Sequence, residues 1–152
     1  MRNVLTRCTI LALIIGPSIF PLAAVAQATA SIVPIRSATL TNKVALEVPV
    51  TATCGPLGDP FGGPAARAFV NVTVTQAAGH ALAQAGGTGQ VLCDGAAHAV
   101  TVTMTAANVP FHSGQNAVVS ATLDGCGLEP GTGTFTCVSA STSGPIQLRN
   151  SN

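Results

Sequence analysis

The sequence predicts an all-β fold, an antiparallel two-sheet β-sandwich with about seven strands and two disulfides. Three observations support this prediction. Hydrophobic and polar residues alternate with a period of two along several segments, as they do in half-buried antiparallel strands. Glycine, proline, asparagine and aspartate separate these segments. An even number of cysteines, four, follows the apolar N-terminal region.

Residues 1–26 have the features of a secretory signal peptide. The segment begins with two arginines, continues with an apolar run over residues 8–20 and offers an Ala-Val-Ala cleavage site at 24–26. We expect cleavage after Ala26, with Ala30 as the alternative. A membrane-spanning helix needs about 20 apolar residues, and prolines interrupt this shorter run. The segment therefore predicts export of the chain and no membrane association after signal cleavage.

The remaining chain is expected to contain one domain. We assign residues 27–43 to an N-terminal strand or lead-in and residues 44–152 to a single β-sandwich domain. Four basic and five acidic residues are scattered over residues 27–152. Nucleic-acid binding depends on clustered cations that contact phosphates, so nucleic acid is excluded as a partner.

Strict alternation predicts strands in five segments. They are residues 43–54, 66–76, 100–105, 116–123 and 133–141. In the last segment, Phe135 and Cys137 share one face. Residues 77–87, AAGHALAQAGG, contain three glycines and no strict alternation, so we expect a turn or irregular connection there. Two packed sheets are the expected arrangement of the strands, and a closed barrel is the alternative.

The four cysteines are Cys54, Cys93, Cys126 and Cys137. An even number in a small exported domain predicts disulfides, for which three pairings are possible. A local Cys126–Cys137 bridge would close a hairpin and would leave Cys54 to pair with Cys93. Each bridge is expected to contribute about 3–4 kcal/mol. A zinc site is the alternative, but the paired C-x2–4-C spacing of structural zinc sites is missing.

Residues 91–105, VLCDGAAHAVTVTMT, contain the strongest candidate for a chemical site. Asp94 precedes glycine, a typical turn pair, and His98 is expected at the rim of the strand that follows. A functional pair of Asp94 and His98 is the alternative, and His112 is a further weak candidate in an exposed loop. A hydrolase or metalloprotein would require at least two of these side chains and that of His80 to converge. We expect no catalytic residue, no metal and no cofactor.

Four stretches between Val44 and Leu123 together resemble a known class of domains. VTATC, FVNVTVTQ, VLCDGAAHAVTVTMT and GQNAVVSATL occur in this order. They resemble a class of small secreted bacterial domains, of actinobacterial type, with a C-D-G-x-x-H segment. The resemblance implies an immunoglobulin-like (Ig-like) sandwich in an exported protein and supplies no catalytic residue. A weaker resemblance is to neocarzinostatin-type apoproteins, whose cysteine spacings differ from those found here.

The spacing of Cys54 and Cys93 is similar to that of the inter-sheet bridge of immunoglobulin domains. However, the sequence has no Trp to pack on the bridge and no Tyr for a tyrosine corner. We therefore expect an Ig-like architecture without a direct relation to immunoglobulins.

These observations predict an exported, non-enzymatic structural or interaction module at the cell envelope or in the extracellular space. Its partner would be a protein or another component of the cell envelope. The alternative is a carrier of a small apolar ligand, with a pocket between the sheets lined by Phe61, Phe111 or Phe135.

Overall fold

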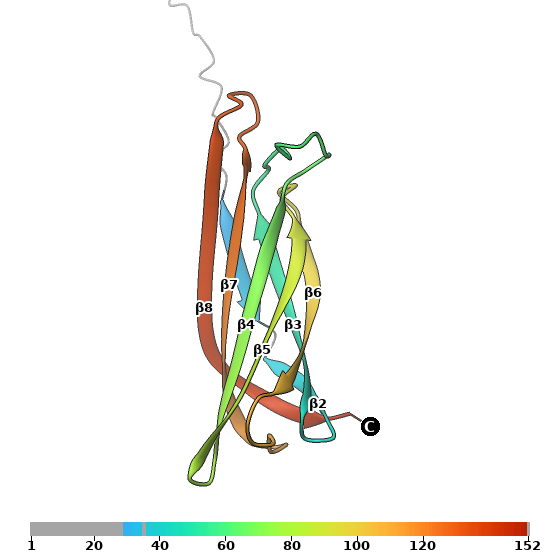
Figure 1. Ribbon diagram of the computed structural model, residues 1–152, viewed down its shortest axis with the longest axis vertical. Coiled ribbons are helices and arrows are strands. Elements are labelled where there is room, and N and C mark those ends of the chain that lie inside the picture. Colours follow the sequence, from blue (N-terminus) through green and yellow to red (C-terminus); the bar gives the residue numbers. More distant parts are fainter. Residues whose placement is uncertain (1–28, 35, 152) are drawn as a thin grey trace, which may run out of the picture.

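The computed structural model describes residues 29–34 and 36–151, and the regular elements in these ranges are all β-strands (Figure 1). The expected signal peptide, residues 1–26, lies outside the described residues. The strands are β1 (Ala30–Pro34), β2 (Ser37–Thr41), β3 (Ala45–Cys54), β4 (Arg67–Ala78), β5 (Ala81–Leu92), β6 (Ala97–Ala106), β7 (Asn116–Leu128) and β8 (Phe135–Asn150). The predicted all-β class is confirmed. The described ranges contain no helix that could cross a membrane.

The strands form one sheet that closes on itself. Their order is β1-β3-β2-β8-β7-β4-β5-β6, and β6 pairs again with β3, so seven strands make a closed ring. Two seams of the ring are short, because β5 pairs with β6 over two residue pairs and β2 pairs with β8, in parallel, over four. The sequence favoured two sheets. The continuous hydrogen bonding instead produces the barrel that was the alternative, and closure leaves fewer strand edges without partners.

β1 and β2 pair in succession with the same edge of β3. β1 pairs with Val50–Cys54 and β2 with Ala45–Glu47, while β6 occupies the opposite edge over nine residue pairs. β2 also pairs with β8 and thereby closes the ring. The segment 27–43, expected as a lead-in to the domain, thus contributes two strands to the barrel.

β5 corrects the expectation of a turn or irregular connection at residues 77–87. β4 and β5 form a hairpin of twelve residue pairs. Ala83 and Ala85 on β5 are buried, and a Cβ atom at Gly87 would lie only 2.8 Å from the carbonyl oxygen of Thr103 on β6. Small residues are needed because β5 passes close to β6, and in the sequence the same glycines resemble turn residues.

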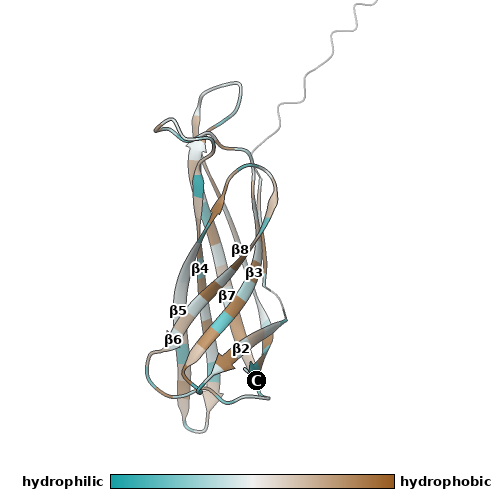
Figure 2. Cartoon of the chain, turned by 90° about the vertical axis from the view of Figure 1, so that its right-hand side faces the viewer, coloured by the Kyte–Doolittle hydropathy of each residue, from teal (hydrophilic) through white to brown (hydrophobic). Residues whose placement is uncertain are grey.

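Alternating side chains of the strands fill the barrel, and bands of hydrophobic and hydrophilic residues follow one another along the strands in Figure 2. We call the end with the β3–β4, β5–β6 and β7–β8 connections, at the top of Figure 1, the upper end, and the opposite end the lower end. Leu57 is buried at the upper end, where its N–H donates to the carbonyl of Cys93. Phe111 is buried at the lower end, where its N–H donates to the carbonyl of Lys43. Loop side chains therefore complete the core at both ends.

Both predicted disulfides are present. Cys54–Cys93 joins the end of β3 to the residue that follows β5, and both cysteines are buried. Cys126–Cys137 joins two directly opposite residues of β7 and β8 and is exposed on the outer surface. Phe135 shares this outer face and is 59% exposed. The shared face of Phe135 and Cys137 is thus the surface of the barrel and not its core.

Candidate functional site

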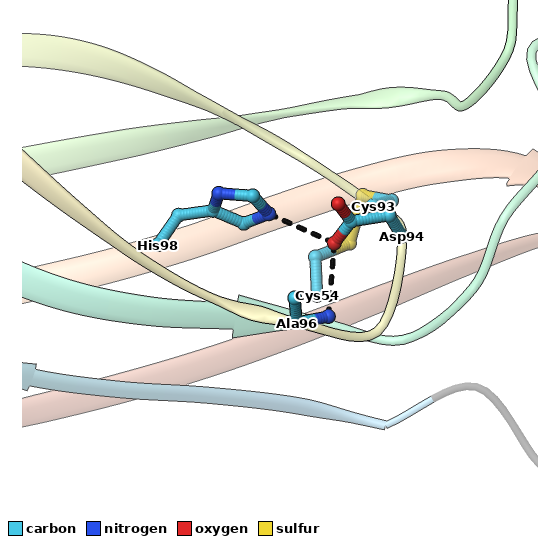
Figure 3. Close-up of polar contacts among 5 residues, drawn as sticks. All are labelled: Cys54, Cys93, Asp94, Ala96 and His98. Atoms are coloured by element: carbon cyan, nitrogen blue, oxygen red, sulfur yellow. Dashed lines mark hydrogen bonds and ion pairs between the residues drawn. A yellow bond between two sulfur atoms is a disulfide. The ribbon is translucent and has the colours of Figure 1, made fainter.

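Asp94 and His98 do meet, in the turn between β5 and β6 (Figure 3). The Asp94 Oδ1 atom lies 2.8 Å from His98 Nε2 and accepts a hydrogen bond of 2.9 Å from the N–H of Ala96. Gly95 takes a positive φ of 85° and donates its N–H to the carbonyl of Cys54. The aspartate therefore closes the turn, as its position before glycine predicted.

The hydrogen bond from His98 lowers the pKa of the Asp94 carboxyl, and the N–H of Ala96 lowers it further. Both side chains are partly exposed, His98 to 31% and Asp94 to 40%. The carboxylate can thus orient the imidazole ring, the arrangement that an acid–base pair needs. In this fold, the same contacts hold the β5–β6 turn next to the buried disulfide.

The other histidines lie at the opposite end of the barrel. His80 is exposed at the tip of the β4–β5 hairpin, and a twelve-residue strand such as β5 separates it from the Asp94 turn by about 40 Å. The side chain of His112 is also exposed. Within residues 29–34 and 36–151, no three His, Cys, Asp or Glu side chains form a group that could hold a metal ion.

The backbone of His112 is fixed by the one buried polar side chain of the described chain, Gln76. The Gln76 amide accepts from the His112 N–H at 2.7 Å and donates to its carbonyl at 2.9 Å. This pair of bonds places the neighbouring Phe111 in the core. His112 therefore marks a structural anchor of the lower end.

The three phenylalanines proposed to line a ligand pocket do not meet. Phe111 is fully buried in the core, whereas Phe61 is 95% exposed in the β3–β4 connection and Phe135 lies on the outer face of β8. These side chains therefore do not line a common cavity for an apolar ligand.

The sequence analysis did not anticipate an open strand edge on β8. β8 pairs with β7 along Phe135–Gln147, but on its other side it pairs with β2 only along Gln147–Asn150. From Phe135 to Pro145, this second edge has no hydrogen-bond partner among the described residues. In Figure 1, β8 forms the left margin of the barrel and β1 lies behind β7, where it runs close to β8 without pairing with it.

The odd-numbered residues of β8 direct their backbone groups toward this edge. Cys126 and Cys137 are opposite residues whose Cα atoms are 4.0 Å apart, a short separation that identifies a non-hydrogen-bonded pair. The N–H and C=O of Cys137 therefore point away from β7. Further along the strand, the N–H of Gln147 donates to the carbonyl of Arg36 and that of Ser151 to the carbonyl of Leu40. Odd-numbered residues therefore also point their N–H groups away from β7 where this edge is paired.

Burial changes along the inner face of β8. Ala140 faces the interior but is only half-buried, whereas Leu123, its neighbour on β7, is fully buried. Ile146 and Leu148 on the same face of β8 are 1% exposed, because β2 covers this part of the strand. The inner face of β8 is thus less completely covered before Ile146, although Val138 and Ala140 still pack against the core.

The open edge is uncharged. The residues from Phe135 to Pro145, FTCVSASTSGP, include no charged side chain, and serines occupy the outer face at 139, 141 and 143. Comparison with protein-family models, with curated proteins and with solved structures found no match to the chain. A function for this chain therefore has to be argued from its own geometry.

Proposed function

We propose that this protein is an exported, non-enzymatic interaction module that binds another polypeptide strand along the open edge of β8. The observation that supports the proposal is the row of backbone N–H and C=O groups from Cys137 to Ser143 that lack partners among the described residues. Strand addition satisfies such groups and is a recurrent mode of peptide recognition.

The composition of the edge supports the same proposal. Proteins usually protect an open edge with charged residues, bulges or several prolines, because it pairs readily with other chains. β8 pairs with β7 without interruption over thirteen residue pairs, and only Pro145 at the end of the open segment provides such protection. The edge therefore lacks the usual protection, and a strand that binds there has to displace β1, which lies beside β8 without a backbone hydrogen bond to it.

The proposal includes export of the chain and its relation to a class of secreted domains. Disulfides persist in oxidising environments, and the two in this chain are consistent with an extracellular or cell-envelope location. We attribute export to a signal peptide at residues 1–26, cleaved after Ala26 or Ala30. The relation to small secreted bacterial Ig-like domains is likewise an inference from the sequence motifs.

The proposal can be tested by photo-crosslinking on cells that produce the protein. A photoreactive residue at Ser141, on the open edge, should form an adduct with a defined peptide of a partner chain. The same residue at Thr88, which is exposed on β5, serves as the control and should not form this adduct.

A second substitution makes the result specific for strand pairing. Ser139→Pro removes an edge N–H without removing a bond to β7, because the N–H of this odd-numbered residue faces outward. It should abolish the adduct at position 141, whereas Ser139→Ala should preserve it. Equal adducts from positions 141 and 88, or an adduct that survives Ser139→Pro, would contradict the proposal.

A further inference from the structure

The lower end of the barrel carries an open pocket of about 630 Å³ where β8 meets β2 (Figure 1). Two arginines, Arg36 and Arg149, line this pocket, and among the described residues no acidic side chain does. We infer that the pocket binds a phosphate monoester, an oxyanion that carries nearly two negative charges at neutral pH. This site is separate from strand binding at β8 and does not depend on it.

The parallel seam between β2 and β8 brings the two arginines together. The N–H of Gln147 donates to the carbonyl of Arg36 at 3.0 Å, just before β2 begins. Arg149 lies two residues beyond Gln147 on the same outer face of β8. One arginine therefore lies across the seam from Gln147 and the other lies along the strand from it. The pairing that closes the barrel thus also creates the pocket.

Three neutral polar residues complete the polar lining. Ser37 on β2, Gln147 on β8 and Asn116 on β7 are register partners in adjacent strands. All three belong to the outer face, because the residues next to them in each strand are buried. Adjacent strands are about 4.8 Å apart, so one hydroxyl and two amides form a short row of hydrogen-bond donors.

The donors of the pocket are not used within the protein. None of its five polar side chains makes a hydrogen bond or an ion pair with another residue of the described ranges. Arg67 differs, because its guanidinium donates to Gln90 Oε1 at 3.2 Å. The one ion pair in the described part of the chain joins His98 and Asp94, at the upper end. The pocket donors are therefore available to a ligand.

The charges around the pocket favour an anion. Lys43 in the β2–β3 turn adds a third positive charge at the lower end. Glu47 is the one acid of the lower half among the described residues, and Thr39 separates it from Arg149 in the register. Two strand spacings, about 10 Å, thus lie between Glu47 and Arg149. The other four acids lie in the upper half.

The number of arginines indicates a dianion. A guanidinium can bind a phosphate or a carboxylate through two parallel hydrogen bonds. Two guanidinium groups without an acid are neutralised by a phosphate monoester, whereas a single carboxylate balances only one of them. Pro145 lines the same pocket and is exposed, so its ring can contact the carbon part of the ester. A pocket of this volume is in the range that holds a small organic molecule.

Titration calorimetry with glycerol 3-phosphate tests the site. Arg36→Gln and Arg149→Gln should each weaken binding by about tenfold to hundredfold, because each removes charge-assisted hydrogen bonds. Arg67→Gln is the matched control and should leave binding unchanged. All three side chains are exposed, and a wild-type thermal transition would show that each variant is folded. No binding at millimolar ester, or an equal loss in Arg67→Gln, overturns the inference.

The pH dependence distinguishes a phosphate from a carboxylate. Binding should weaken as the pH falls through about 6, where a phosphate monoester takes up a proton, while the arginines stay charged. His80 and His112, at the same end of the barrel, can only gain positive charge in this range and would oppose the loss. Acetate should bind at least tenfold more weakly than the ester. Equal binding of acetate, or constant ester affinity between pH 7 and 5, would contradict a phosphate site.

Vesicles identify the source of the phosphate group. Phosphatidic acid carries a phosphate monoester headgroup, and phosphatidylcholine vesicles serve as the control. Binding to phosphatidic acid vesicles that glycerol 3-phosphate displaces would support a lipid headgroup as the ligand. Binding of the soluble ester without vesicle binding would support a soluble phosphate ester. Vesicle binding that persists in the Arg36→Gln, Arg149→Gln double variant would show attraction outside the pocket and overturn the inference.

Discussion

The backbone N–H of Gln147 donates to the carbonyl oxygen of Arg36 at 3.0 Å, and this bond divides β8 into two parts with different surroundings. Beyond it, toward the C-terminus, Leu148 is buried under the pairing with β2. Before it, β8 pairs only with β7, β1 lies alongside without bonding to it, and Ala140 stays half-buried. This bond therefore marks where the hydrogen-bonded contact of β8 with the β2 segment begins.

The two disulfides should differ in their contribution to stability. Removing Cys54–Cys93, which spans 39 residues, should lower the free energy of unfolding by about 4 kcal/mol, because the longer loop gains more entropy on unfolding. Removing Cys126–Cys137, which spans 11 residues, should cost about 3 kcal/mol. Denaturant unfolding of the two double Cys→Ala variants measures both values.

The disulfides should also differ in their reactivity toward a mild reductant. Cys126–Cys137 is exposed and Cys54–Cys93 is buried, so a reductant should reach the first bridge in the folded protein and the second only after opening. Partial reduction, alkylation and peptide mass spectrometry would identify the labelled pair. Labelling of Cys54 and Cys93 first would contradict the structure.

The Asp94 carboxylate should make the stability of the protein depend on pH. Its pKa is lowered by the hydrogen bond to His98 and by the N–H of Ala96, so the ionised form favours the folded state. This contribution is present above the ordinary carboxyl pKa of about 3.9 and is lost as the pH falls through the lowered pKa. Asp94→Asn should therefore be less stable than the wild type at neutral pH.

The difference between Asp94→Asn and the wild type should shrink when both are unfolded in increasingly acidic buffer. Glu47→Gln is the control, because Glu47 is exposed and its side chain makes no hydrogen bond or ion pair within the described residues. A stability difference for Asp94→Asn that stays constant down to the lowest pH would refute the role of the carboxylate.

Adjacent glycines on β5 should respond differently to a methyl group. Gly87→Ala should destabilise the protein by about 1–3 kcal/mol, because the new Cβ would meet the Thr103 carbonyl of β6 at 2.8 Å. Gly86→Ala should be neutral or slightly stabilising, because its nearest contact is an ordinary 3.8 Å. Thermal and urea unfolding of both variants test the close crossing of β5 and β6.

Phe111 should be the aromatic residue on which stability depends most. Phe111→Ala empties a fully buried site and should cost about 3–5 kcal/mol. Phe61→Ala is the matched control and should change stability little, since this ring is 95% exposed. A similar loss in both variants would mean that Phe111 does not close the lower end of the core.

Sequence patterns that depend on near neighbours in the chain predicted the strands and the turn correctly. Alternation over residues 43–54 and 116–123 identified strands whose apolar positions are buried, among them Val48 and Val119. The aspartate–glycine pair at 94–95 identified a turn that the structure contains. The alternation of a strand and the bonding of an aspartate to its own turn depend on near neighbours in the chain, so the sequence alone carries them.

The sequence predictions that were wrong depend on contacts between residues that are distant in the chain. Gly87 indicated a turn in the sequence, but its small size is needed against β6. Phe135 alternates with threonines like a core residue, yet its face is the outer surface. Neither assignment can be made until the neighbouring strand is known, because a strand has two faces and the sequence does not label which one is inside.

The sequence by itself determined the all-β class, the set of disulfide cysteines and the uncharged character of Phe135–Pro145. Only the tertiary structure decided that the sheet closes through β3 and β6 and that Asp94 lies far from His80. It also decided that β2 covers only the C-terminal part of the β8 edge. Side-chain alternation follows from backbone geometry within one strand, whereas closure and free edges follow from which strands pair across the whole chain.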